Sequence, residues 1–373
     1  MSAPPPPLPR WADIGLLPII NVLAALVVSG VIIALIGEDP FKAMGVMIQG
    51  AFVYNGGLGY TLYYTTNFIF TGLAVAVAFH AAMFNIGGEG QAYVGGLGAA
   101  IAVLMADAIL PGLLMIPLAV AFSALFGALW AFIPGWLQAT RGSHIVITTI
   151  MFNFIAASLV LWAVRGPMAR GGPGSPETRP FEESAHMPYV HEVLGAIGIP
   201  FDRSPLNLSI LIAIAACFLV WFIIWRTRFG YSLRALGHSP GAAEYAGMNS
   251  TRIIVLAMLL SGGLAGLMAS NAVLGEPHKL VLNFTGGYGF TGIAVALMGR
   301  NHPIGIVLAA LLFGALTQGG TELDFEFQTI TRETVQVVQG LIILFSGALA
   351  YLFAPWLARA LAPFLTKKTG ATA

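Results

Sequence analysis

The sequence predicts an all-α, polytopic integral membrane protein with about ten transmembrane helices, some of them broken, and an inverted repeat. Hydrophobic residues make up 57% of the 373 residues and charged residues only 9%, whereas a soluble domain has about 25% charged residues. Apolar runs of membrane-spanning length follow one another along most of the chain. One apolar region is interrupted by FNIGGEGQ at 84–91. Non-helical backbone persists in lipid only where protein covers it or where it lines a wet cavity, so this break indicates a pathway.

The apolar runs place the spans in chain order. We expect them at 16–36, 61–82, 91–108, 113–133, 145–164, 206–225, 253–272, 281–299, 304–320 and 333–353. The spans 91–108 and 304–320 are shorter than the roughly 20 residues that cross a bilayer, so we expect broken or tilted helices there. Before the transmembrane domain at 16–353, residues 1–15 form a proline-rich, flexible cytoplasmic tail. Residues 354–373 form a cytoplasmic C-terminal tail.

The distribution of basic residues predicts the orientation. Most of the seventeen Lys and Arg residues fall in the connectors on the side of the N-terminus, which the positive-inside rule makes cytoplasmic. Both termini are then cytoplasmic and the loop 165–205 is external. This loop is too rich in proline and glycine for a long helix, and it is either folded over the pore mouth or a solvated linker. The segment 37–60 is amphipathic enough to lie at the outer interface.

The stretch FNIGGEGQ supplies the first candidate pathway residues. Its glycines destabilise a helix by about 1 kcal/mol each relative to alanine, and they allow close backbone approach. Asn85, Glu89 and Gln91 then present amide and carboxylate groups that suit the hydroxyls and base edges of an uncharged polar solute. Alternatively, Glu89 is a buried acid that accepts bonds from backbone amides and holds the loop in shape.

A related pattern occurs five spans later, where Asn283 precedes FTGGYGFTG. The change in topology between the two segments would make them an inverted repeat around a midplane site.

Aromatic side chains could stack on a nucleobase, although aromatic residues in membrane helices also face lipid or pack; the candidates are Phe84, Phe284, Tyr288 and Phe290. A polar set in the span 145–164 either lines the pathway or bonds back to its own helix; it comprises Thr148, Thr149 and Asn153.

The connector 226–252 is longer than a turn requires. Ser239 is a good helix cap, Pro240 suits the first turn, and Gly247 is a natural stop, so we expect a short helix between them. Connections between helices usually take about 2–8 residues. The extra structure favours a docking surface for a cytoplasmic partner over a loop that is ordered but binds nothing.

Several functions are excluded or disfavoured by what the sequence lacks. No GxxxxGK[ST] loop or HExxH motif occurs, and the seven histidines are scattered. The single Cys217 allows no disulfide within one copy, and the net charge of +1 gives no reason to expect a nucleic-acid partner. We therefore expect a transport subunit that is not an enzyme and holds no cofactor or metal of its own.

Four motifs in order resemble the membrane permease subunits of nucleoside-type ABC importers, a branch that also serves ribose-like sugars. They are FNIGGEGQ at 84–91, RGSHIVITTIMFN at 141–153, RALGHSPGAAEYAGMN at 234–249 and GGYGFTGIAVALMGRNHP at 286–303. The resemblance implies a coupling helix that docks on the ATPase; the matching residues are Arg234, Ser239, Pro240, Ala243, Glu244 and Gly247.

The same resemblance implies the partners and the location. We expect ATPase subunits that bind ATP-Mg, a second homologous permease forming a hetero- or homodimer, and an external substrate-binding lipoprotein, all at the bacterial plasma (inner) membrane. Alternatives within the class are simple-sugar and branched-chain amino-acid permeases. An ion-coupled transporter or channel is a different class, but Glu89 alone stands well inside the predicted bilayer, which is too little for an ion relay. A membrane enzyme would need a reactive constellation that the motifs do not supply.

Overall fold

The computed structural model describes residues 9, 11–169, 176–327, 329–330, 332–345 and 353–366. In these ranges the chain is helical and forms isolated β-bridges but no strand. The predicted tail 1–15 lies largely outside the described residues. The chain divides into two compact units, Met1–Gly50 with Gly319–Ala373, and Ala51–Gln318, and each is considered by itself.

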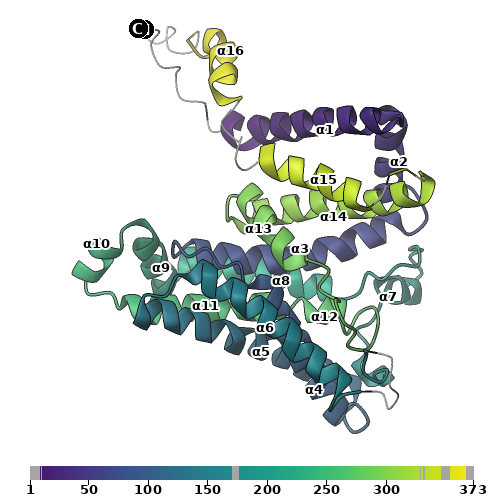
Figure 1. Ribbon diagram of the computed structural model, residues 1–373, viewed down its shortest axis with the longest axis vertical. Helices are drawn as coiled ribbons and strands as arrows, with labels where there is room; N and C mark the ends of the chain where they lie inside the picture. Colours follow the sequence, from purple (N-terminus) through teal and green to yellow (C-terminus); the bar gives the residue numbers. More distant parts are fainter. Residues whose placement is uncertain are drawn as a thin grey trace. The chain divides into compact units, whose positions relative to one another are not determined.

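The first unit contains both ends of the chain (Figure 1). A π-helical turn, Ala12–Leu16, leads into α1 (Leu17–Ile36), which is followed by α2 (Pro40–Phe52). The helices α15 (Arg332–Ile343) and α16 (Ala354–Thr366) come from the C-terminal part. A small apolar core joins α1, α2 and the segment 323–335; it includes Ile33, Ala43, Val46, Leu323, Phe327 and Val335.

The second unit is built around two helices that are almost wholly buried. These are α3 (Gly57–Phe79), of which 83% is buried over its most apolar stretch, and α4 (Gly88–Ala106). Around them lie α5 (Gly112–Arg141), α6 (Ile145–Arg165), α8 (Ser209–Arg226), α11 (Ser250–Gly266), α12 (Ala269–Ala272) and α13 (Tyr288–Met298). The helix α14 (Pro303–Glu326) starts in this unit and ends in the first. Since α5, α6 and α8 are largely exposed and apolar, their outer faces suit lipid.

Small residues let the inner helices approach one another closely. A Cβ atom added to Gly127 of α5 would lie 2.3 Å from the carbonyl oxygen of Gly262 in α11, and one added to Gly95 of α4 would lie 2.5 Å from the Cα of Gly266. Such contacts between small residues are the usual means of packing helices where lipid surrounds them. They also explain why α4 is less hydrophobic than a typical span although it is buried.

Seven helices among the described residues are long and apolar enough to cross a membrane, and they match seven of the predicted spans. The predicted span 304–320 is one continuous helix, α14, and α4 is also unbroken, so of the two alternatives for these spans only a tilted helix stays a prediction. The break instead precedes α4, at 80–87. The span 253–272 is interrupted at Leu267 and Met268, between α11 and α12.

The predicted span 281–299 was wrong over its first seven residues. Helix α13 begins only at Tyr288, and Asn283, Gly286 and Gly287 have positive φ angles. This stretch scores as apolar because Leu280, Leu282 and Phe284 pack against the core that contains α4. Hydropathy cannot separate a buried loop from a buried helix. For the last span, 333–353, the described helix α15 ends at Ile343, and 346–352 lie outside the described residues.

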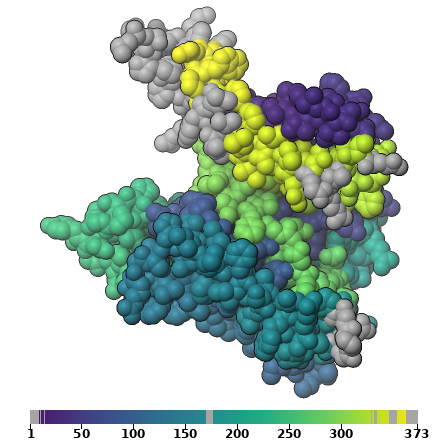
Figure 2. Space-filling model, in the orientation of Figure 1, coloured from purple at the N-terminus to yellow at the C-terminus, as the bar shows by residue number. Residues whose placement is uncertain are grey.

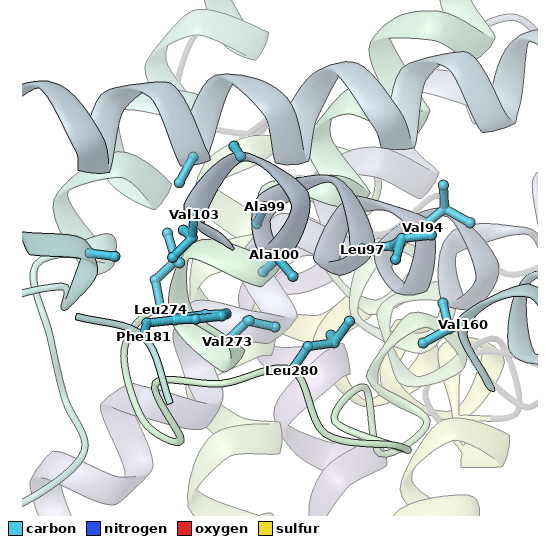
Figure 3. Close-up of a cluster of buried hydrophobic side chains, with 14 of the residues drawn as sticks. Val94, Leu97, Ala99, Ala100, Val103, Val160, Phe181, Val273, Leu274 and Leu280 are labelled. Carbon is cyan, nitrogen blue, oxygen red and sulfur yellow. The ribbon is translucent and has the colours of Figure 1, made fainter. Parts of the chain in front are cut away.

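The loop 165–205 is folded onto the rest of the second unit. Its amides bond to the segment 274–280, with Thr178 N to Leu280 O at 3.0 Å and Phe181 N to His278 O at 2.7 Å. Figure 3 shows Phe181 beside Leu274 and Val273, beneath Val103 of α4, in the cluster that also contains Leu280. The loop contains a short helix, α7 (Val190–Ala196), and no long one in its described part. The loop is therefore packed onto the second unit and is not a solvated linker, while its position over an external pore mouth stays a prediction.

The connector 226–252 forms the short helix that the sequence predicts. After α9 (Arg228–His238), Ser239 caps α10 (Pro240–Tyr245) by accepting a bond from Ala242 N at 3.4 Å. Gly247 has a φ angle of 79° and ends the turn. Because α8 runs between this connector and the loop that holds α7, the two lie at opposite ends of the second unit (Figures 1 and 2). We call these ends the α10 end and the α7 end.

Candidate functional site

The two glycine-rich segments that the sequence singles out meet inside the second unit. A Cβ atom on Gly289, in the first turn of α13, would lie only 2.2 Å from the amide nitrogen of Glu89, in the first turn of α4. Only glycine permits this approach, since the neighbouring atoms are backbone. We call the region where the N-termini of α4 and α13 meet the α4–α13 junction.

Glu89 holds the junction together. Its Oε1 accepts bonds from the Thr285 hydroxyl and from Gly287 N at 3.0 Å, and its Oε2 accepts a bond from Gly289 N at 2.8 Å. The carboxylate thereby satisfies free N–H groups at the start of α13, where a negative charge is favourable. Both oxygens of Glu89 are engaged within the protein, which fits the predicted shaping role. Contact with a solute stays a prediction.

The side-chain amides of Asn85 and Gln91 bond to each other, and their contact with a pathway stays a prediction. Asn85 Nδ2 donates to Gln91 Oε1 and Gln91 Nε2 donates to Asn85 Oδ1, both at 3.1 Å. Asn85 Oδ1 also accepts from Gly87 N at 2.8 Å, and its Nδ2 donates to Ser261 Oγ at 2.9 Å. Both amides are fully buried. Their polar groups are thus consumed by the fold, as burial requires.

The polar set on α6 is also directed at the chain itself. Asn153 Oδ1 accepts from Gly90 N at 2.9 Å, and its Nδ2 donates to Ile86 O at 3.0 Å. Asn153 therefore clamps the non-helical backbone before α4. Thr148 and Thr149 bond back to carbonyl groups of their own helix, Thr149 to Ile145 O at 2.8 Å and Thr148 to Ile145 O at 3.0 Å. This is the structural alternative that the sequence left open.

Three of the four predicted aromatic residues pack against other rings near the junction, and the fourth is exposed. Phe284 stacks on Tyr93 with ring centroids 5.3 Å apart, and Phe84 packs edge-on against Phe79. Tyr288 packs edge-on against Phe68 at 5.4 Å. Phe290, in the first turn of α13, is 48% exposed. Asn283, in the loop before α13, is also exposed, and its Oδ1 accepts a bond from the Tyr93 hydroxyl at 3.5 Å.

The family of the chain follows from comparison with known proteins. The family described as "Branched-chain amino acid transport system / permease component" matches residues 57–347. The chain belongs to this permease family. It is 34% identical to a glucose ABC transporter permease of Haloferax volcanii, over 90% of this chain and 88% of the relative. It is 35% identical to a guanosine ABC transporter permease of Bacillus subtilis (88% and 92% covered) and 33% identical to a nucleoside ABC transporter permease of Lactococcus lactis (88% and 90%).

Membership makes the chain a multi-pass membrane component of an ABC transporter. It confirms the prediction of a transport subunit that is not an enzyme, because the relatives are permeases. The site of this permease then concerns passage of a solute and needs no reacting group. Its relevant features are the buried polar framework of the junction and the residues that the framework leaves exposed.

The two junction helices of the permease run in opposite directions. Helix α4 ends at Asp107, whose carbonyl accepts a bond from Ser184 Oγ at 2.6 Å at the α7 end. Helix α13 leads to His302, whose ring lies 5.0 Å from that of Trp225 at the far end of α8. Two helix starts that meet inside the unit and diverge toward its opposite ends fit the predicted inverted repeat.

The sequence reasoning missed several residues that build this site. Thr285 binds Glu89, and Ser261 links Asn85 to α3 by donating to Ala74 O at 2.6 Å. Asn271 donates to Asn67 Oδ1 and to Tyr63 O, both at 2.9 Å. The run TLYYTTNFIFT at 61–71 carried a usable signal, because so many polar groups in one buried span need partners.

The α10 end exposes part of the predicted coupling set. Glu244 is exposed and accepts a bond from Ser250 Oγ at 3.0 Å, while Ala243, also in α10, is buried. Tyr245, which was not among the predicted residues, is 97% exposed. Gly237 lies against the end of α3, since a Cβ there would be 2.3 Å from His80 O. Helices α9 and α10 are thus anchored to α3, and α10 projects.

An ion pair ties the loop 165–205 to the C-terminal end of α4, at the α7 end. Both guanidinium NH groups of Arg179 bond to the carboxylate of Asp107, at 2.7 and 2.8 Å, and Glu182 N donates to the same carboxylate at 3.1 Å. Burial opposes the charged form of Asp107, but these hydrogen bonds outweigh burial and lower the pKa of its carboxyl. The bidentate geometry fixes the loop to the helix.

Proposed function

We propose that this permease carries nucleosides across the bacterial plasma membrane. The observation that supports it best is the rim of the α4–α13 junction, where the exposed ring of Phe290 and the exposed amide of Asn283 lie at one helix start. An aromatic face stacks on a nucleobase, typically with about 1–3 kcal/mol per base. An amide bonds to base edges or ribose hydroxyls. The guanosine and nucleoside permeases among its relatives agree with this assignment.

A simple sugar is the second candidate, because a glucose permease is equally similar to the chain. The two are separated by uptake of labelled guanosine and labelled glucose into cells that lack their own importers for both and express the complete transporter. We expect ATP-dependent guanosine uptake that excess inosine inhibits and excess glucose does not. Uptake of glucose with no uptake of guanosine would contradict the proposal.

We also propose that α10 docks on a cytoplasmic ATPase, which binds ATP-Mg. The exposed position of Tyr245 and Glu244 supports this, as does the anchoring of α9 to α3 through Gly237. Ser239, Pro240 and Gly247 would set the shape of the docking turn, and Arg234 its base. A second homologous permease, the same or different, would complete the pathway.

The α7 end is then external and receives the substrate-binding lipoprotein, and both termini are cytoplasmic. Single cysteines at Glu183 and Tyr245, both exposed positions, test this orientation in a Cys217→Ala background. An impermeant thiol reagent applied to whole cells should label the first and not the second. Labelling at 245 from outside would reverse the orientation and remove α10 as the ATPase contact.

A further inference from the structure

A polar cavity of about 500 Å³ opens at the α7 end of the second unit. Its walls come from three places far apart in the sequence: the start of α3, the segment around α7 with the residues before α8, and the turn after α12. The wall residues with functional side chains are Tyr60, Tyr189, His191, Glu192, Arg203 and Glu276. The volume lies in the range of about 300–1,000 Å³ that small-molecule sites occupy. It is separate from the α4–α13 junction.

The cavity is a formed site and not a gap between loops. Val190 N bonds to Leu206 O at 2.9 Å and Leu208 N bonds to Pro188 O at 3.0 Å, which fixes the two chain segments that flank α7. Tyr189 is held by a bond of 3.0 Å between its hydroxyl and His278 Nε2. The walls are therefore positioned before any ligand arrives.

Aromatic faces line one part of the wall. Tyr60 is 39% exposed. The rings of Tyr189 and His191 stack with centroids 5.2 Å apart and an interplanar angle of 28°. Flat aromatic side chains of this kind can stack on any nucleobase, because every base has a planar π face.

The charged groups of the wall suit hydroxyl donors. Glu276 Oε2 accepts a bond from the Tyr63 hydroxyl at 3.0 Å, which orients this carboxylate, and Glu192 supplies a second one. The wall thus carries two carboxylates and one guanidinium, that of Arg203, a charge balance that suits hydroxyl donors and disfavours a phosphate. In the described part of the chain, two polar atoms of the wall, His191 Nδ1 and Ser204 Oγ, are buried without a hydrogen-bond partner. Such groups call for an explanation.

A path of tyrosines leads from the cavity to the junction. Tyr63, which bonds to Glu276 of the cavity, packs edge-on against Tyr64 with centroids 5.4 Å apart. Tyr64 in turn packs against Tyr288 of the junction at 6.1 Å. Aromatic side chains thus continue along α3 from one place to the other.

We propose that the cavity is a second, peripheral binding site for an unphosphorylated nucleoside, which it holds before passage to the α4–α13 junction. The base would stack on Tyr60 or Tyr189, and the ribose hydroxyls would donate to Glu192 and Glu276. This inference rests on the proposed nucleoside function.

The test is photolabelling of the complete importer in membranes with 8-azidoguanosine, followed by mapping of the labelled peptides. We expect label in the segments 54–64 and 189–207, removed by excess guanosine and retained with excess guanosine monophosphate. In Tyr60→Leu and in Glu192→Gln, the guanosine concentration needed to remove the label should rise about fivefold, as expected for loss of one stacking or hydrogen-bonding contact. Tyr54→Leu and Glu183→Gln are the matched controls, because both residues are exposed in the same unit and do not line the cavity.

The outcomes separate this inference from the proposed function. If wild-type cells take up guanosine but no label falls on these segments, or if both cavity variants compete like wild type, the cavity is not a nucleoside site. If Tyr60→Leu and Glu192→Gln weaken binding of the substrate-binding protein to the same degree as photolabelling, the surface is a protein contact and the inference is overturned. If wild-type cells take up glucose and no guanosine, the proposed function has failed independently of the cavity.

Discussion

Replacing Glu89 by glutamine tests the junction most directly. In the native protein, one oxygen of Glu89 accepts from Thr285 and Gly287, and the other accepts from Gly289. Glutamine has one acceptor oxygen, so its NH₂ group must face one of these N–H donors. A buried amide left without an acceptor costs about 1–3 kcal/mol, and loss of the charge at the start of α13 adds up to about 2 kcal/mol at a partly buried site. We expect a loss of about 2–4 kcal/mol in the free energy of unfolding.

The measurement is reversible unfolding by SDS in mixed micelles, with Glu183→Gln as a control that changes an exposed carboxylate of the same unit. Thr285→Val removes one donor and keeps the charge, so it should cost less than Glu89→Gln. Among molecules that still fold, the ratio of guanosine to inosine uptake should stay unchanged. Native stability in Glu89→Gln, together with a selective loss of uptake for one solute, would refute the structural role and place the carboxylate on the solute.

Three further predictions concern Gly289, helix α10 and His278. Gly289→Ala should abolish the folded permease, because its Cβ would press on the backbone of Glu89, while Gly241→Ala, with open space around it, should fold; gel filtration of a fluorescent fusion distinguishes them. Glu244→Arg should leave thermal stability unchanged and reduce ATP-driven uptake at least severalfold; unchanged uptake would argue against docking at α10. Burial and, as the second cause, the nearby His186 lower the pKa of His278. This histidine therefore binds a proton more readily in the unfolded chain than in the folded protein. Thermal stability should then fall as the pH drops below about 6.5, and His278→Gln should flatten this dependence.

The sequence predicts the parts of the fold that depend on local chemistry. Long apolar runs give seven spans that match observed helices, although α5 and α14 run eight and six residues past the predicted ends, since a lipid solvent leaves helices as the available structure. The turn from Ser239 to Gly247 is predicted closely because a capping hydroxyl, a proline and a left-handed glycine act within the turn itself. These features need no knowledge of distant neighbours.

The candidate site is less accessible to such reasoning because its partners are distant in the chain. Glu89 binds groups about 200 residues later, and Asn85 bonds to Ser261. A sequence shows that Asn85 and Gln91 are polar, but not that each satisfies the other. Buried apolar loop residues, such as Leu280 and Leu282, give the same hydropathy as a membrane span. The predicted start of α13 was therefore seven residues too early.

Burial and bonding together narrow the candidates for solute contact. A polar group inside a membrane protein is costly unless it is bonded, and the bonds of Asn85, Gln91 and Asn153 go to backbone groups, to each other or to Ser261. Replacing one of these should therefore damage folding before it alters selectivity. Asn283 and Phe290 are different, because both are exposed at the start of α13, where the framework ends. Under the proposed function, Asn283 and Phe290 would contact the solute, and the framework residues, although the more conspicuous in the sequence, would set the positions of those two side chains.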